Sequence, residues 1–175
     1  MDAVMKRFVD NESEAVDRLA ASSDILTVAA RRDEGSREFH VRFSSPTLVY
    51  EGGDVRRWHG YHVALRLTAD YLRIVEQPLL VATIEAPHHV WHPNVHGPFI
   101  CLGNIAPGTG LVELLYRIYA ILSYQKFTPH EANALNPTAC AWARAHLSWF
   151  PLTVAPLRRP LIPFETAQVI AENPS

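Results

Sequence analysis

The sequence predicts an α+β domain in which helices cover one face of a four-stranded antiparallel sheet. Three observations predict it: an amphipathic N-terminal segment, several alternating apolar runs separated by turn residues, and an apolar helical stripe late in the chain. A chain of 175 residues suffices for one ordinary domain. We expect this domain to span residues 1–150, with a proline-rich tail at 151–175 that packs on it or extends from it.

The first helix is expected over residues 3–20, where apolar side chains recur at helical spacing: Val4, Phe8, Ala15 and Leu19. Four strands should follow it. Residues 25–30 are short and β-prone, residues 39–43 and 61–67 alternate apolar and polar side chains, and residues 79–84 form the continuous run of an inner strand. Turn residues at 44–46 and 51–54 separate the runs, which predicts a meander.

All periodicity is lost over residues 86–110, which contain four prolines and four glycines. Long loops inside compact domains are often functional. A central buried helix should follow, with its apolar stripe at Leu111, Leu114, Leu115, Ile118, Ile121 and Leu122. A further helix should begin at Asn136-Pro137 and reach about His146, because Asn caps helices and Pro suits their first turn.

The composition excludes several classes of function. A net charge of −2 argues against a nucleic-acid partner, because a surface that follows phosphates is usually basic. Two cysteines are too few for a disulfide framework and indicate free thiols in a reducing compartment. The N-terminal segment lacks the apolar core of a signal peptide, and no run approaches the roughly 20 apolar residues that cross a bilayer. We therefore expect a cytoplasmic protein without a membrane partner.

The aperiodic loop contains the residues best suited to chemistry. Cys101 lies in an irregular stretch, where a thiol is easily exposed, and a thiolate is both a strong nucleophile and a good leaving group. The side-chain amide of Asn94 can donate a hydrogen bond to an oxyanion. A free cysteine is more commonly a small buried hydrophobe, however, and spacing alone favours that role for Cys101.

A resemblance to a known family changes this balance. The motif His92-Pro93-Asn94, its spacing to Ile100-Cys101-Leu102, the helix that follows and the later Leu135-Asn136-Pro137 resemble the catalytic half of the ubiquitin-conjugating (E2) enzymes. Tyr71 and Gln77-Pro78 are similar to a degraded form of the family's Tyr-Pro…Pro-Pro stretch. The resemblance covers approximately residues 1–150 and implies the UBC-like fold.

The resemblance also implies residue roles. Cys101 would accept the C-terminal acyl group of a ubiquitin-like protein from an activating enzyme (E1) as a thioester, and would transfer it to an amine of a target protein. Asn94 would stabilise the oxyanion or hold the loop that does so, and His92 and Pro93 would shape that loop. Asn133 would position the incoming lysine, although an amide cannot act as its base. No cofactor is implied.

The chain departs from the family pattern in three regions. The loop between Asn94 and Cys101 is about one residue shorter than is common in the family. The tryptophan usual after the cysteine is missing, and Ala106-Pro107-Gly108 belong to the segment that stands there. Because this segment helps to bind E3 ligases in the family, an E3 partner is uncertain. The first helix is more acidic than basic, so the E1 partner should be unusual. With these departures, the chain resembles the divergent E2-like proteins of bacterial ubiquitin-like conjugation operons. Some of those operons act in antiviral defence.

Three alternatives remain. His88, His89, His92, His96 and Cys101 crowd one loop and are potential zinc ligands, but they lack the paired spacing of metal sites, so we expect no metal. A Cys-His-Asn hydrolase would need an imidazole oriented on the thiol. An inert E2 variant would only bind a ubiquitin-like protein, although such variants typically lack the cysteine. For Cys140, and for Tyr119, Trp142 and Trp149, packing is the default expectation, and Arg158 and Arg159 should be solvated.

Overall fold

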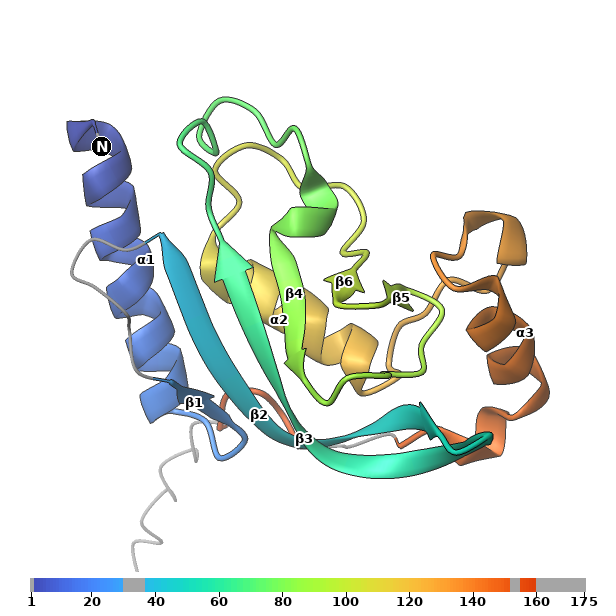
Figure 1. Cartoon of the computed structure of the whole chain (residues 1–175). Helices are drawn as coiled ribbons and strands as arrows, with labels where there is room; N and C mark the ends of the chain where they lie inside the picture. Colours follow the sequence, from blue (N-terminus) through green and yellow to red (C-terminus); the bar gives the residue numbers. More distant parts are fainter. Residues whose placement is uncertain (1, 30–36, 152–154, 160–175) are drawn as a thin grey trace, which may run out of the picture.

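A long bent hairpin forms the centre of the fold (Figure 1). The computed structural model describes residues 2–29, 37–151 and 155–159. Within them the structure is α+β, as predicted. Its helices and strands are, in chain order, α1 (Ala3–Ala21), β1 (Leu26–Val28), β2 (Glu38–Glu51), β3 (Asp54–Arg66), the 3-10 helix η1 (Pro78–Leu80), β4 (Ala82–Ala86), β5 (Val95–His96), β6 (Phe99–Ile100), α2 (Leu111–Leu122), the 3-10 helix η2 (Glu131–Asn133), α3 (Pro137–Ala145) and the 3-10 helix η3 (Leu147–Trp149).

The described sheet has six antiparallel strands in the order β1-β2-β3-β4-β6-β5, whereas the sequence predicted four. The first four strands follow the predicted meander. The two additional strands, β5 and β6, are two residues each and lie within the predicted loop at 86–110. Strands this short leave no recognisable alternation in the sequence, because alternation needs about four residues to show.

The predicted turn at 51–54 is confirmed, and the predicted turn at 44–46 is wrong. Gly52 and Gly53 connect β2 to β3 with φ angles of +62° and +91°, which a hairpin turn of this kind requires. Residues 44–46 lie inside β2, where the pairing register shifts between Phe43 and Pro46. Opposite this bulge, Gly60 has a φ of +86°, and a Cβ there would lie 3.3 Å from the Phe43 carbonyl oxygen. The bulge bends the hairpin instead of ending the strand.

The predicted inner strand is displaced along the chain. The apolar run at 79–84 begins in η1, and β4 starts only at Ala82. Pro78 occupies the first turn of η1, where its missing N–H is harmless. Leu79 and Leu80 are consequently exposed instead of buried in the sheet.

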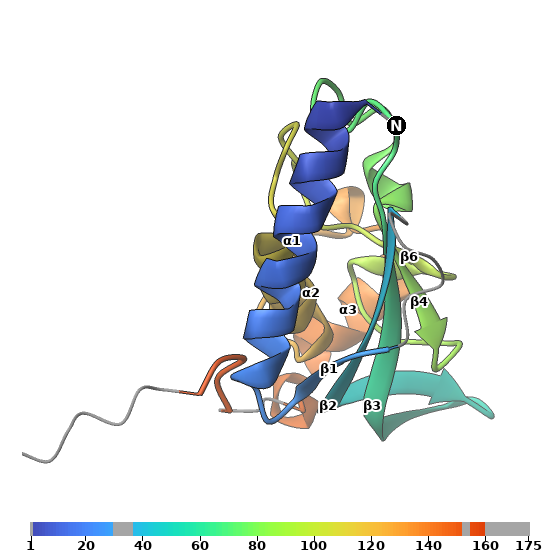
Figure 2. The same cartoon turned by 90° about the vertical axis from the view of Figure 1, so that its left-hand side faces the viewer.

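Helices α1 and α2 pack together on one face of the sheet and form the main core with it (Figure 2). The buried side chains of α1 are Met5, Val9, Val16 and Leu19, while Val4 of the predicted stripe is 70% exposed. The predicted row, which begins at Val4, and the buried row, which begins at Met5, lie one residue apart along the helix. The sequence of the helix does not show which of the two rows faces the core. The predicted stripe of α2 is confirmed, since all six of its members are buried.

Helix α3 covers the far half of the hairpin and forms a second, smaller apolar cluster. Buried Leu48, Tyr124 and Ala143 make its centre. The predicted start of α3 is confirmed, because the Asn136 side chain accepts a hydrogen bond of 3.0 Å from the Ala139 N–H and Pro137 is the first helical residue.

Little of the predicted tail at 151–175 lies within the described residues. Leu157 is buried against the main core, and the Arg159 N–H donates to the Ser22 carbonyl oxygen at 2.7 Å. Arg159 also donates from its guanidinium to the Ala21 carbonyl oxygen, so this exposed side chain has protein partners. Residues 152–154 and 160–175 lie outside the described part.

Candidate functional site

Cys101 lies directly after β6, in an irregular segment that is anchored on both sides. Its N–H donates to the Asn94 carbonyl oxygen at 2.8 Å. Downstream, the Arg117 guanidinium of α2 donates to the carbonyl oxygens of Leu102, at 3.5 Å, and Asn104, at 2.6 Å. The Cys101 side chain is half-buried, and it is a free thiol. The segment therefore holds a partly accessible thiol at a fixed place.

The imidazole of His92 is buried inside the turn that precedes this thiol. Its Nδ1 accepts a hydrogen bond of 3.0 Å from the Asn94 N–H, so we place the proton of the neutral ring on Nε2. Burial lowers the pKa of His92 to about 3, and the nearby Lys126 backbone opposes this only partly. The ring also packs edge-on against Tyr124, with a centroid separation of 4.4 Å. His92 is thus neutral and shapes the turn from within.

The side-chain amide of Asn94 is held by Thr128. Its Nδ2 donates to Thr128 Oγ1 at 2.9 Å, and its Oδ1 accepts from the Thr128 N–H at 2.9 Å. A longer contact of 3.4 Å joins Nδ2 to the Cys101 carbonyl oxygen. The buried thiol of Cys140 donates to the Thr128 carbonyl oxygen at 3.2 Å. Thr128 therefore connects the segment of Cys140 to Asn94, which itself bonds directly to the backbone of Cys101.

The segment that carries Asn133 is tied to the same turn at both of its ends. Thr128 binds Asn94 at one end, and at the other the Asn136 N–H donates to the Pro93 carbonyl oxygen at 2.9 Å. Between them, Asn133 is exposed on η2. The structure thus brings the segments of His92, Pro93, Asn94, Cys101 and Asn133 into one region, and its hydrogen bonds do not connect the Asn133 amide to the thiol.

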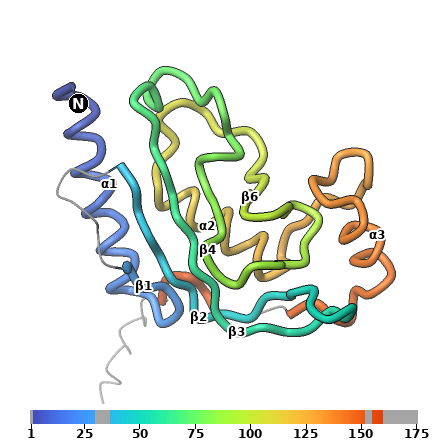
Figure 3. The backbone as a smooth tube through the Cα atoms, in the orientation of Figure 1, coloured from blue at the N-terminus to red at the C-terminus, as the bar shows by residue number. Residues whose placement is uncertain are grey.

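The segment with Ala106, Pro107 and Gly108 forms a turn after the thiol. The Gly108 N–H donates to the Tyr71 carbonyl oxygen at 3.1 Å, and the Tyr71 hydroxyl donates to the Thr109 carbonyl oxygen at 2.8 Å. Figure 3 shows this segment beside the loop between β3 and β4, at the end of the molecule opposite the hairpin tip. Ala106 and Pro107 are exposed there.

The histidines of the loop do not gather around the thiol. His92 is buried in the turn, His96 is exposed on β5, and His88 and His89 are exposed before the turn. Among the residues that the structure describes, no three His, Cys, Asp or Glu side chains are placed to hold a metal ion.

A Cys-His-Asn arrangement is not assembled either. His92 uses Nδ1 to accept from the Asn94 N–H, and its depressed pKa makes it a very weak base near neutral pH. Within the described ranges, no hydrogen bond joins an imidazole to the Cys101 thiol. The geometry therefore gives little support to a hydrolase.

Sequence reasoning did not identify Thr128 or Arg117 as part of this region. Thr128 follows α2 by six residues with no motif around it, and Arg117 reads as an ordinary surface residue of an amphipathic helix. Cys140 is buried, in agreement with the packing role expected for it, and its thiol also donates to the Thr128 carbonyl oxygen. The rings of Trp142 and Trp149 pack edge-to-face, and the Tyr119 hydroxyl donates to the Ala155 carbonyl oxygen at 2.6 Å.

No protein-family model matches the chain, and no curated protein is similar enough in sequence to count as a relative. No helix among the described residues has the length and apolar character needed to cross a membrane.

The arrangement can carry out one kind of chemistry well. A half-buried thiol at a fixed place, with no imidazole hydrogen-bonded to it in the described residues, can accept an acyl group and release it again to a stronger nucleophile. Among the described residues no imidazole is hydrogen-bonded to the thiol, and attack by water, which needs deprotonation by a base, gains less from such a site than attack by a neutral amine.

Proposed function

We propose that this chain is an E2-like conjugating enzyme, which accepts a ubiquitin-like protein from an E1 as a thioester on Cys101 and transfers it to an amine of a target protein. The observation that carries the proposal is the hydrogen bond from the Cys101 N–H to the Asn94 carbonyl oxygen, which places the half-buried thiol beside the turn formed by His92, Pro93 and Asn94. The resemblance of these residues to the E2 family adds to it.

The chemistry has two steps. In the first, the Cys101 thiolate attacks the thioester carbonyl carbon of the loaded E1, and the E1 cysteine leaves as a thiolate. In the second, a neutral target amine attacks the carbonyl carbon of the new thioester. The carbon–sulfur bond of Cys101 breaks, Cys101 leaves as a thiolate, and the amine proton passes to solvent. An amide bond forms, and no redox partner is needed.

Asn94 supports this chemistry by holding the site rather than by offering a free donor. Both ends of its amide are used by Thr128, and its remaining Nδ2 hydrogen has only the 3.4 Å contact to the Cys101 carbonyl oxygen. That weak contact can be exchanged for an oxyanion during transfer. Asn133, exposed on the neighbouring segment, would position the lysine by hydrogen bonding.

Two surfaces bear on the proposed partners: helix α1, on which an E1 would dock, and the turn at 106–108, where an E3 would bind. Two of the three basic side chains of α1 pair with acidic ones, Lys6 with Asp10 at 2.7 Å and Arg18 with Glu14 at 3.4 Å. An E1 that docks on this helix would therefore meet a mixed surface instead of a basic one. The turn at Ala106, Pro107 and Gly108 presents no large side chain to an E3, so transfer would rely on direct contact between the enzyme and its target.

The test is a charging reaction with ATP, a candidate E1 and a candidate ubiquitin-like protein, followed on a non-reducing gel. The proposal predicts an adduct that dithiothreitol removes, that Cys101→Ala abolishes and that Cys140→Ala leaves intact. Cys101→Ser should give an ester that dithiothreitol does not cleave. Addition of free lysine should then discharge the thioester, more slowly for Asn94→Ala and Asn133→Ala.

Other outcomes would redirect the assignment. If the E1 becomes charged but passes nothing to this chain, and the chain still binds the modifier, it is a binding module of the inert-variant type. If the chain instead cleaves an amide or ester of the modifier, the hydrolase reading replaces the transferase.

A further inference from the structure

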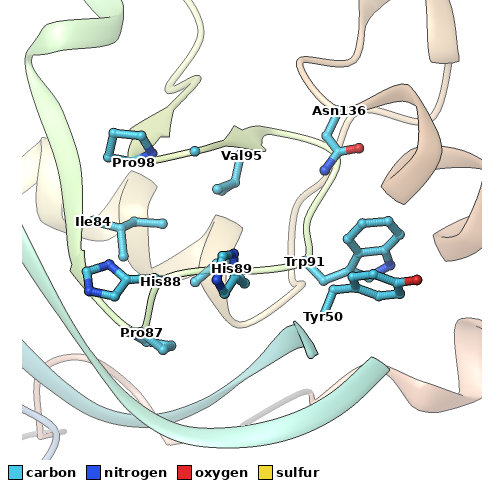
Figure 4. Close-up of a pocket in the computed structure, with 11 residues that line it drawn as sticks. Tyr50, Ile84, Pro87, His88, His89, Trp91, Val95, Pro98 and Asn136 are labelled. Carbon is cyan, nitrogen blue, oxygen red and sulfur yellow. The ribbon is translucent and has the colours of Figure 1, made fainter. Parts of the chain in front are cut away.

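A groove of about 420 Å³ lies between the segment that precedes His92 and strand β5 (Figure 4). Its volume falls within the range of about 300–1,000 Å³ that is usual for ligand pockets. The lining is mostly apolar and aromatic, and includes Tyr50, His88, His89, Val90, Trp91 and Val95. None of its lining residues is acidic, whereas two exposed imidazoles line it.

One wall of the groove is an unpaired strand edge. Val90 pairs with Val49 of β2 through an isolated antiparallel bridge, in which the Tyr50 N–H donates to the His89 carbonyl oxygen and the Trp91 N–H donates to the Leu48 carbonyl oxygen. In this pattern the N–H and C=O of Val90 point away from β2. No hydrogen bond in the described part of the chain satisfies either group.

The opposite wall is the outer edge of the sheet. Strand β5 is the last strand in the sheet order, and Val95 pairs with Ile100 of β6. Because the Cys101 N–H donates to the Asn94 carbonyl oxygen across this pair, the C=O of Val95 points away from β6. Within the described ranges it too has no hydrogen-bond partner, although the Val95 N–H is used locally by the His92 carbonyl oxygen at 3.0 Å. Two strand edges with open backbone groups thus line the same groove.

We infer that this groove binds an extended peptide segment of a partner protein, which adds as a strand between Val90 and β5 and places an acidic side chain against His88 and His89. Backbone pairing would satisfy the open groups of Val90 and Val95, and every second peptide side chain would enter the apolar part of the groove. The carboxylate follows from hydrogen bonding, because an imidazole N–H donates to a carboxylate and the lining offers no competing acid.

The backbone of His89 is strained where it lines the groove. Its φ is +96°, a strained value for a non-glycine residue and one that is found often at ligand clamps. The bond from the Tyr50 N–H to the His89 carbonyl oxygen, 2.9 Å long, fixes this backbone. The ring of Tyr50 in turn stacks on Trp91, with centroids 4.7 Å apart. The inference does not depend on thioester chemistry at Cys101.

The test is a titration of the full ¹⁵N-labelled chain with blocked hexapeptides of alternating Val and Thr that carry a single Glu. The inference predicts amide shift changes centred on Val90 and His96, and about a tenfold loss of affinity when the peptide Glu is replaced by Gln. N-methylation of either alternate set of peptide residues should weaken binding, because one set of N–H groups faces Val90 and the other faces the Val95 carbonyl oxygen.

Two matched variants locate the carboxylate contact. His88→Glu should abolish binding of the Glu peptide and spare the Gln peptide, while His59→Glu, an exposed histidine of β3 outside the groove, should change neither. Shift changes that avoid Val90 and β5, equal affinity for the Glu and Gln peptides, or indifference to both N-methylation patterns would each overturn the inference.

Discussion

At the scale of single residues, the two thiols differ in access, and this difference is directly measurable. Cys101 is half-buried, whereas Cys140 is fully buried and donates to Thr128. We expect one thiol per native chain to react quickly with an aromatic disulfide reagent. The second should react at least about tenfold more slowly, because it must wait for local opening.

Variants of each cysteine show which of the two thiols gives the fast reaction. Cys101→Ala should remove the fast phase, and Cys140→Ala should remove only the slow one. If both thiols of the native protein reacted at one rate, the proposed distinction between a functional and a structural cysteine would be wrong.

His92 should make the protein sensitive to acid. Its folded pKa of about 3 lies below the value of about 6.5 for an unfolded chain, so the unfolded state binds the extra proton between these values. The neutral ring therefore makes its full contribution to the free energy of unfolding above pH 6.5, and this contribution is lost as the pH falls from 6.5 toward 3. It amounts to several kcal/mol, at about 1.4 kcal/mol per pKa unit.

Urea unfolding between pH 7 and pH 4.5 tests this prediction. His92→Gln removes the titrating group and should be less stable at pH 7 by roughly 2–4 kcal/mol, because it loses a buried ring and the bond from the Asn94 N–H. Its free energy of unfolding should then fall less steeply with acid than that of the wild type. Equal slopes for both proteins would contradict a buried neutral His92.

The sequence predicted the chemically distinctive residues better than the residues that hold them. Cys101, Asn94 and His92 belong to a recognisable motif, whereas Thr128 has no local signature. Thr128 matters only because tertiary packing brings it within 2.9 Å of the Asn94 amide. Such a contact depends on two distant segments, and no local pattern encodes it.

At the scale of elements, α1 supplies a cap to α2. Glu12 lies in the buried row of α1, and its carboxylate accepts the Leu111 N–H at 2.5 Å, at the start of a helix whose N-cap, Gly110, has no side chain to offer. A carboxylate at this position also interacts favourably with the helix dipole. The sequence showed Glu12 only as one of several acidic residues of the helix.

Replacing Glu12 with Ala should therefore lower the free energy of unfolding by about 1–2 kcal/mol, because the Leu111 N–H loses its partner. Glu14→Ala is the matched control, since Glu14 is exposed and its ion pair with Arg18 should contribute less than about 0.5 kcal/mol. Chemical denaturation of both variants measures the difference. Equal losses would mean that Glu12 does not cap α2.

Elements with a local signature were predictable, and elements that depend on pairing partners were not. The Gly52-Gly53 turn and the Asn136 cap of α3 follow from residue chemistry. By contrast, the bulge opposite Gly60 and the short strands β5 and β6 arise from the fit between strands. The wrong turn at 44–46 has the same cause, because Ser and Pro suit a bulge as well as a turn.

At the scale of the whole molecule, the thiol segment lies near the seam between two apolar clusters of very different size. The main core joins α1, α2 and the sheet, while the second cluster rests on Leu48, Tyr124 and Ala143 under α3. The contacts of Thr128 with Asn94 and Cys140 connect the two sides. Small clusters open more readily than large ones.

We therefore expect the amides of α3 to exchange with solvent through a local opening with a lower free energy than those of α2. Native-state hydrogen exchange read by NMR measures both. Asn94→Ala should lower the protection of α3 further without changing that of α2, because it removes the bond to Thr128. Equal protection of the two helices would contradict a separate, weaker unit.

The most direct test of the central claim is intact-mass spectrometry of the chain after incubation with ATP, an active E1 and its ubiquitin-like protein. The account predicts a mass increase equal to the modifier minus one water molecule on the wild type and on Cys140→Ala. The increase should be absent from Cys101→Ala and reversed by dithiothreitol. A charged E1 beside an unmodified chain, or an adduct that persists in Cys101→Ala, would contradict the assignment of Cys101 as the carrier.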